Sequence, residues 1–256
     1  ASNSNSSNNG VSYTFGGQWE PSKRLRVEAG YGNNRFITVE VTPFNRLHWI
    51  TTYTNNDIGL NTGDTWNTSL NYSSRRSVLT ASYSEATVTT QQLLLEQQIV
   101  ETTDAFGNPI KDPLDNAILR NIGLPTLTDE VFVTKTADIS FSFRTGKSNV
   151  NASASKVMRT FELSGNDEEV TRLSTSWDWK FSNLSSSSLS AGWQKTESDG
   201  VNAFSDRRYD FSASLTRNIL ARLNGSIRYQ YIDQSSNDNL NSYSENRISA
   251  NLSLQF

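Results

Sequence analysis

Apolar and polar side chains alternate along most of this chain with a period of two residues. The pattern is clearest over residues 248–256, where Ile248, Ala250, Leu252 and Leu254 alternate with polar residues. Such alternation is typical of a β-strand with one apolar and one hydrated face, and the segment is long enough to cross a bilayer. The pattern therefore predicts a strand of a transmembrane barrel.

Thirteen segments share this alternation, and short turns alternate with longer polar connections between them. Short turns in the periplasm and longer loops outside the cell are expected of an outer-membrane barrel. The segment around Ala152 is the weakest, because Lys156 interrupts its apolar face. We expect an all-β fold, a transmembrane antiparallel outer-membrane β-barrel, with residues 1–256 as one domain. Its strands are expected over residues 11–19, 25–31, 37–41, 47–53, 66–72, 79–83, 137–144, 152–158, 173–181, 189–193, 209–215, 223–231 and 248–256.

The strand count predicts a further part of the barrel. With Phe256 at the periplasmic end, thirteen strands place Ala1 outside the cell. Bacterial single-chain barrels instead have an even number of strands and both termini in the periplasm. We expect about fourteen or more strands in the intact barrel, with this chain as its C-terminal part. A missing N-terminal barrel segment or a second chain would complete it, although a miscounted strand would also restore an even number.

Composition excludes several other classes of protein. Only 35% of the residues are apolar and the mean hydropathy is −0.56, and no run reaches the roughly 18 apolar residues of a membrane helix. The aromatic content of 11% is too high for a disordered chain. The absence of Cys excludes disulfides and thiolate metal sites. The net charge of −3 gives no reason to expect nucleic acid as a partner. We expect a location in the bacterial outer membrane, in contact with its lipid.

The polar face of the predicted strands carries seven basic and six acidic candidates for a lumen lining. Such a balance argues against a pore selective for one sign of charge. It suits a neutral or weakly charged solute, or a hydrated wall cross-linked by ion pairs, and ion pairing is the favoured interpretation for any single residue. The candidates are Arg26, Glu28, Glu40, Asp138, Arg144, Arg172, Asp178, Lys180, Arg208, Asp210, Arg228, Glu245 and Arg247.

Large aromatic residues fall mostly on the apolar face. A girdle at the membrane interfaces is the favoured interpretation, because amphipathic rings sit at the level of lipid headgroups. A sugar-stacking track inside the pore is the alternative. The residues are Trp19, Trp49, Trp66, Trp177, Trp179, Trp193, Tyr209, Tyr229 and Tyr231.

Residues 91–130 form the longest connection. Residues 91–100 have the composition of a short amphipathic helix, and the rest contains three Pro and is loop-like. Long loops are commonly functional, and we expect an apolar one to pack against protein rather than extend into water. We interpret this extracellular-side loop as a lid or constriction at the mouth of the barrel, with Leu93, Leu94, Leu95, Ile99 and Phe106 as its apolar residues.

The sequence shows no catalytic or metal-binding motif. His48 is the only histidine, and without Cys or a second His no spacing indicates a metal site. The G-x-S-x-G elbow and the Gly-rich phosphate loop are also absent. We therefore expect no enzyme activity, no cofactor and no metal.

Residues 16–36 and 71–97 carry two further motifs. The first contains Trp19, Pro21, Arg24, Tyr31, Gly32, Arg35 and Phe36, and the second Arg75, Arg76, Ala81, Tyr83, Glu85, Thr89, Gln91, Gln92 and Leu93. Both resemble the PEP-CTERM-system-associated outer-membrane barrels that accompany exopolysaccharide export loci. The resemblance implies polysaccharide passage through the outer membrane, a long N-terminal half and no catalytic residues. The spacer Asn33-Asn34 departs from the family's tighter pattern.

The leading functional expectation is an outer-membrane pore or conduit for a hydrophilic polymer, with exopolysaccharide export favoured. Its expected partners are secreted polysaccharide and periplasmic export components. A structural sleeve or anchor for a partner protein assembly is one alternative, and a general small-solute porin is another.

Overall fold

The computed structural model describes residues 13–56, 63–89, 100–101, 119–120, 131–200, 203–220, 223–237 and 241–254. Within these residues no helix is long and apolar enough to cross a membrane. The strands are β1 (Thr14–Ser22), β2 (Leu25–Gly32), β3 (Asn34–Phe44), β4 (Leu47–Asn56), β5 (Gly63–Ser73), β6 (Ser77–Thr89), β7 (Val100–Glu101), β8 (Leu119–Arg120), β9 (Val131–Arg144), β10 (Ser148–Phe161), β11 (Asp167–Lys180), β12 (Ser185–Ser198), β13 (Phe204–Leu220), β14 (Leu223–Ser236) and β15 (Tyr243–Leu254).

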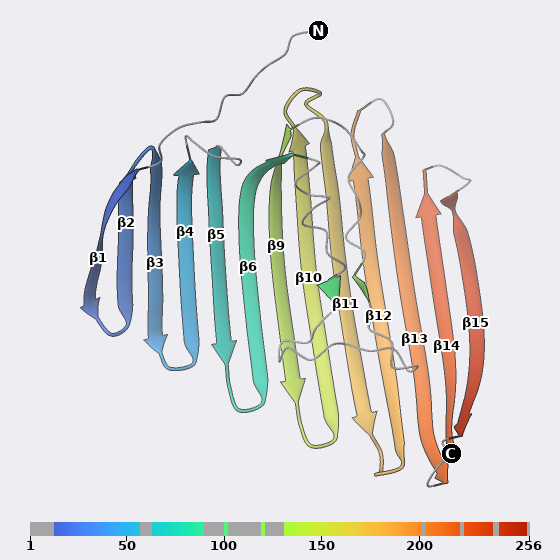
Figure 1. The fold of residues 1–256 in the computed structure, drawn as a ribbon. Helices are drawn as coiled ribbons and strands as arrows, with labels where there is room; N and C mark the ends of the chain where they lie inside the picture. Colours follow the sequence, from blue (N-terminus) through green and yellow to red (C-terminus); the bar gives the residue numbers. More distant parts are fainter. Residues whose placement is uncertain are drawn as a thin grey trace.

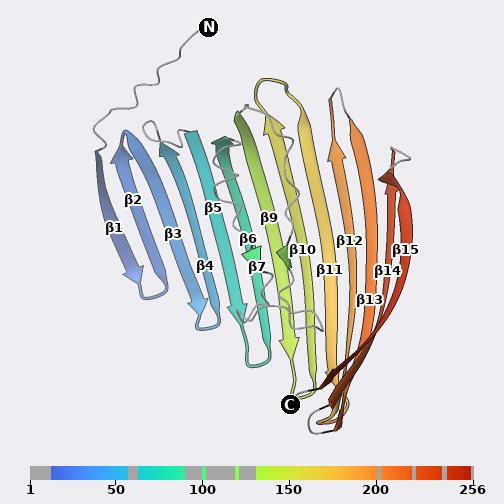
Figure 2. The same ribbon diagram turned by 45° about the vertical axis from the view of Figure 1, so that its right-hand side comes forward.

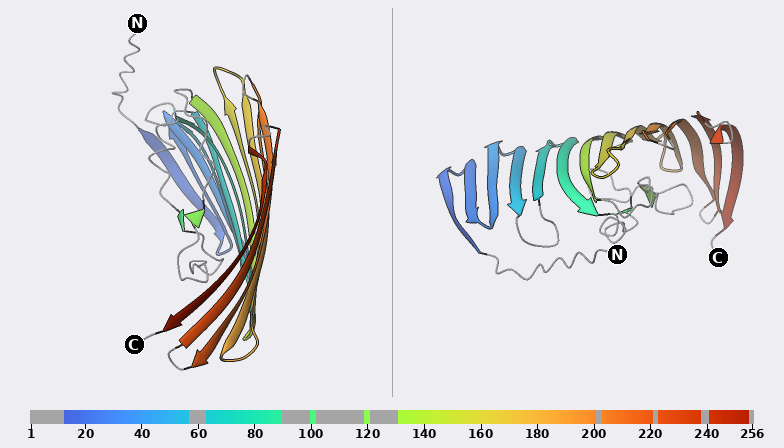
Figure 3. Two further views of the ribbon diagram at one scale, coloured as in Figure 1. Left: turned by 90° about the vertical axis from the view of Figure 1, so that its right-hand side faces the viewer. Right: turned by 90° about the horizontal axis from the view of Figure 1, so that it is seen from above.

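Thirteen strands form one antiparallel sheet in which each strand neighbours the next along the chain (Figure 1). β6 pairs directly with β9, so the long insertion does not interrupt the sheet. The sheet is curved, as Figure 2 and the view from above in Figure 3 show. β1 and β15 are its edges and do not pair with each other in the described residues. The short strands β7 and β8 pair with each other and lie on the concave side (Figure 3).

The register keeps apolar residues together across the sheet. One row across β9 to β13 consists of Ile139, Ala154, Leu173, Trp193 and Tyr209, each the register partner of the next. Because successive side chains point to opposite faces of a strand, the residues next to this row along each strand lie on the other face. The alternation in the sequence thus becomes one apolar and one polar face over the whole sheet.

The apolar face is the exposed face, and it is convex. On β13, Tyr209, Phe211 and Leu215 are exposed, whereas the polar residues between them are half-buried. Side chains are crowded inside a curve and spread apart outside it, so the polar face is the concave one. On β15, Ile248 is 76% exposed and Leu252 is 70% exposed. An apolar surface of this extent marks contact with something other than water.

The few buried apolar side chains lie on the concave face. They are Val78, Phe132, Phe161 and Val170 among the described residues. The rings of Phe132 and Phe161 pack with their centroids 5.3 Å apart. Phe132, Phe161 and Val170 lie at the loop end of β9 to β11 and Val78 lies at the turn end of β6, so the buried apolar side chains sit inside the curve rather than between two layers.

All thirteen expected strands are present, which confirms the predicted all-β antiparallel fold. The expected alternation of short and long connections is wrong between β2 and β3, where Asn33 alone connects the strands. The strands β7 and β8 lie in the insertion, where the sequence indicated no strand. Two expectations concern residues that the structure does not describe. One is the placement of the ends Ala1 and Phe256. The other is the lid, with Leu93, Leu94, Leu95, Ile99 and Phe106.

Candidate conduit wall

The alternation and register place all thirteen candidate lumen residues on the concave face. Their role in lining a pore stays a prediction, but their common orientation is a property of the fold. They are Arg26 and Glu28 on β2, Glu40 on β3, Asp138 and Arg144 on β9, Arg172, Asp178 and Lys180 on β11, Arg208 and Asp210 on β13, Arg228 on β14, and Glu245 and Arg247 on β15.

Two ion pairs join four of these residues. Arg26 and Glu40 are register partners on β2 and β3 and form one ion pair. Glu245 and Arg247 form the other, with the carboxylate and guanidinium 2.6 Å apart. His48 Nδ1 lies 3.7 Å from Glu40 Oε1, so the single histidine belongs to the first cluster. These charges largely neutralise one another within the wall.

Hydroxyl and amide groups bond across the concave face between the charged residues. Arg172 donates hydrogen bonds of 3.1 and 2.7 Å to the amide oxygen of Gln194 on the next strand. Hydroxyl pairs join Thr80 to Ser140 at 2.6 Å, Ser153 to Ser174 at 2.7 Å and Ser190 to Ser212 at 2.7 Å. These hydroxyls are not among the candidate lumen residues, although repeated Ser and Thr at the polar positions of the sequence were their signal. The wall is thus hydrated and nearly neutral.

A second set of charges lies on the convex face, near the loop end of the strands. Three ion pairs occur there: Lys135 with Glu85 at 3.1 Å, Lys156 with Glu169 at 2.9 Å, and Lys195 with Glu197 at 2.6 Å. Glu169 lies beyond the apolar band, and the hydrogen bond from Lys156 holds the pKa of its carboxyl below the ordinary value. Lys156 therefore marks the border of the apolar band, and it does not weaken the strand β10.

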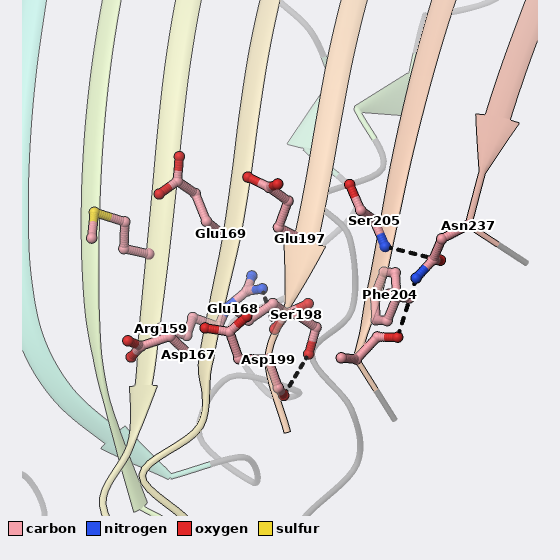
Figure 4. A pocket seen from close by; sticks show the side chains of 12 residues that line it. Arg159, Asp167, Glu168, Glu169, Glu197, Ser198, Asp199, Phe204, Ser205 and Asn237 are labelled. Carbon is pink, nitrogen blue, oxygen red and sulfur yellow. Dashed lines mark hydrogen bonds and ion pairs between the residues drawn. The ribbon is translucent and has the colours of Figure 1, made fainter. Parts of the chain in front are cut away.

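A pocket of about 430 Å³ opens at the loop end of β10 to β13 (Figure 4). Arg159 and Glu168 form an ion pair of 3.1 Å, with side chains only 2% and 7% exposed. Asn237 bonds to the backbone of Ala203 and Ser205 and so joins the end of β14 to the start of β13. Among the described residues no cluster of three or more His, Cys, Asp or Glu is placed to hold a metal. The acidic side chains that line the pocket are Asp167, Glu168, Glu169, Glu197 and Asp199.

Comparison with solved structures finds several outer-membrane proteins that align with this chain at low identity. A loop-deletion form of OmpT, an outer membrane protein of Vibrio cholerae, aligns with a TM-score of 0.44 and 7% identity over 93% of this chain and 89% of that chain. An anion-selective porin from Comamonas acidovorans aligns with a TM-score of 0.44 and 7% identity over 83% and 68%. A COG4313 outer membrane channel from Pseudomonas putida F1 gives 0.34 and 11% over 91% and 85%. Neither protein families nor curated proteins match the sequence.

The geometry of the chain itself defines the class of fold. Only helices and barrels satisfy every backbone polar group in a bilayer, and a barrel strand alternates apolar residues facing lipid with polar residues facing the lumen. The exposed apolar convex face and the hydrated concave face have that arrangement. The chain is thus a transmembrane antiparallel β-barrel wall of the bacterial outer membrane.

Proposed function

We propose that this wall encloses a conduit for a hydrophilic polymer. The observation that supports the proposal best is the nearly neutral, hydroxyl-rich concave face, in which polar groups already bond to one another. Such a wall exchanges hydrogen bonds with sugar hydroxyls without holding them tightly, and weak binding is what conduction requires. A barrel of this strand number measures about 26 Å between opposite backbones, from the usual strand spacing and tilt. That width leaves an aqueous space.

The edges of the sheet support a barrel with additional strands. Thirteen strands that alternate in direction leave β1 and β15 running the same way. An unpaired edge in hydrocarbon costs several kcal/mol for each backbone group. An all-antiparallel closure therefore needs an odd number of further strands, from another barrel segment or a second chain.

The conduit is tested by two neighbouring substitutions on β12. Ser190 faces the concave side and Ala191 the convex side. Ser190→Trp is expected to lower the single-channel conductance in planar bilayers, because the ring enters the lumen. Ala191→Trp, which adds the same ring toward lipid, is expected to leave it unchanged. Equal conductance in both variants and the wild type would contradict a lumen on this face.

The size of the solute separates the conduit from its alternatives. Neutral glucose oligomers of increasing length are added to the bilayer chamber. Transient current reductions that persist with long oligomers support a polymer conduit, whereas exclusion of all but the shortest would indicate a small-solute porin. Absence of any conductance together with a stoichiometric co-purifying protein would indicate a sleeve or anchor.

We further propose that the polymer is an exopolysaccharide and that periplasmic export components are partners. The resemblance of residues 16–36 and 71–97 to the PEP-CTERM-system-associated barrels supports this. Deleting the gene in its own bacterium is expected to retain polysaccharide in the periplasm and remove it from the medium. Unchanged secretion would contradict the proposal.

A further inference from the structure

Three parallel rows cross β10 to β13 on the convex face. The first is apolar and consists of Ala154, Leu173, Trp193 and Tyr209. The second, one step nearer the loops, is Lys156, Thr171, Lys195 and Arg207. The third is Met158, Glu169, Glu197 and Ser205. Cations thus border the apolar band directly, and carboxylates stand beyond them. We call Lys156, Lys195 and Arg207 the cationic row.

Two members of the cationic row face each other without a carboxylate between them. Lys195 and Arg207 are register partners on β12 and β13, and like charges directly opposite destabilise a sheet. Lys195 bonds to Glu197 on its own strand. Arg207 is exposed and has no ion-pair partner within the described part of the chain. An external anion between the two cations would remove their repulsion.

Position identifies the chemistry of that anion. Arg207 stands one step beyond Tyr209, and Lys195 one step beyond Trp193. Amphipathic aromatic rings sit at the headgroup level of a membrane, so the cationic row lies at the depth of lipid phosphates. The planar guanidinium also matches phosphate oxygens in a bidentate manner. We propose that the cationic row binds the phosphate of a membrane lipid headgroup at the outward, loop-side leaflet.

The inference rests on the membrane orientation of the sheet and not on what passes through the lumen. Each basic residue near a membrane surface contributes about 1 kcal/mol to the free energy of binding anionic lipid. Removing one therefore lowers the affinity for that lipid about fivefold. The row of neighbouring cations on β10 to β13 makes the site local, so the loss is expected only for substitutions within the row.

The test measures quenching of tryptophan fluorescence by brominated phosphatidylglycerol and by brominated phosphatidylcholine in mixed micelles. Quenching that is present in the wild type but absent in Trp193→Phe comes from Trp193. This difference measures lipid bound at the cationic row. The wild type is expected to prefer phosphatidylglycerol, and Lys195→Gln with Arg207→Gln is expected to lose the preference by about fivefold for each cation removed. Arg217→Gln changes the same charge on the convex side of β13 at its turn end and should keep the preference.

Controls keep the outcomes distinct. A folded double variant with an undiminished preference for phosphatidylglycerol overturns the inference, as does displacement of the lipid by inorganic phosphate at constant ionic strength. If the double variant does not fold, Lys195→Arg, which keeps the charge, should retain the preference, and added salt should weaken it in the wild type. The conductance of Ser190→Trp tests only the conduit, and the lipid preference tests only the cationic row. Either proposal can therefore fail while the other stands.

Discussion

At the residue scale, burial divides the ion pairs at the loop end into two kinds. The side chains of Arg159 and Glu168 are 2% and 7% exposed, whereas those of Lys156 and Glu169 are 47% and 35% exposed. An exposed pair gains little because water screens both charges. Removing one partner of a buried pair leaves an uncompensated charge away from water. The two pairs therefore differ in energetic weight although their distances are similar.

This difference predicts the effect of single substitutions on stability. Glu168→Gln is expected to lower the free energy of unfolding by up to about 3 to 5 kcal/mol, because the buried guanidinium of Arg159 loses the carboxylate 3.1 Å away. Lys156→Gln, at the exposed pair, is expected to lower it by about 1 kcal/mol or less. Urea unfolding in micelles measures both. The double variant Arg159→Met with Glu168→Leu should recover most of the loss, and equal small losses for both single variants would contradict the role of burial.

The sequence indicates which face a charged residue occupies but not which group it bonds. Period-two alternation places Arg172 on the polar face, and the structure agrees. Two of its hydrogen bonds go to Gln194, a neutral amide, because the β11–β12 register sets these two residues opposite each other. Register depends on the turn and on backbone pairing between strands, which a count of charges does not contain.

At the element scale, the first hairpin shows how closely two strands approach. A Cβ added at Gly16 would lie 2.7 Å from the carbonyl oxygen of Ala29 and 3.1 Å from Cα of Gly30. A Cβ at Gly17 would meet nothing within 4 Å. The two glycines are neighbours on opposite faces of β1, so they differ in crowding rather than in position along the strand.

The crowding predicts opposite effects on the pairing of β1 with β2. Gly16→Ala is expected to loosen the hairpin and speed amide hydrogen exchange in β1, because backbone atoms must move away from the new methyl group. Gly17→Ala is expected to leave exchange unchanged or slow it, since Ala restricts the unfolded chain and stabilises by about 0.4 to 1 kcal/mol. Faster exchange in both variants would show that close approach is not the cause.

Strand existence is predicted well by alternation, whereas strand ends are not. The segment expected over residues 137–144 begins at Val131 in β9, and the one expected over residues 209–215 extends over Phe204–Leu220 in β13. The additional residues do not alternate: β9 begins with three consecutive apolar residues, Val131–Val133, and β13 ends with two, Ile219 and Leu220. They belong to the strands because backbone hydrogen bonding continues past the apolar band.

At the scale of the whole molecule, the two edge strands of the sheet determine how the barrel closes. Each strand of the sheet pairs with the next one along it, and β1 and β15 lie unpaired at the two ends of the curve (Figure 3). Sequence alternation predicted this simple order, because short connections favour antiparallel neighbours. It contained no signal for β7 and β8, whose two-residue lengths are too short to show a period.

The direction of the edge strands gives a prediction about closure. If an odd number of additional strands separates β1 from β15, their backbones are at least about 9 to 10 Å apart, twice the spacing of paired strands. A disulfide needs Cα atoms within about 7 Å. In this chain, which has no native Cys, Gly17→Cys combined with Ala250→Cys should therefore form no disulfide within one molecule. Gly17→Cys with Ala29→Cys, at register partners in the first hairpin, should form one under the same oxidation.

Placing the second cysteine at Ile248 or Leu252 instead covers neighbouring registers of β15. A disulfide inside a single molecule in any of the β1–β15 variants would mean that the two edges pair in parallel and that thirteen strands close the barrel by themselves.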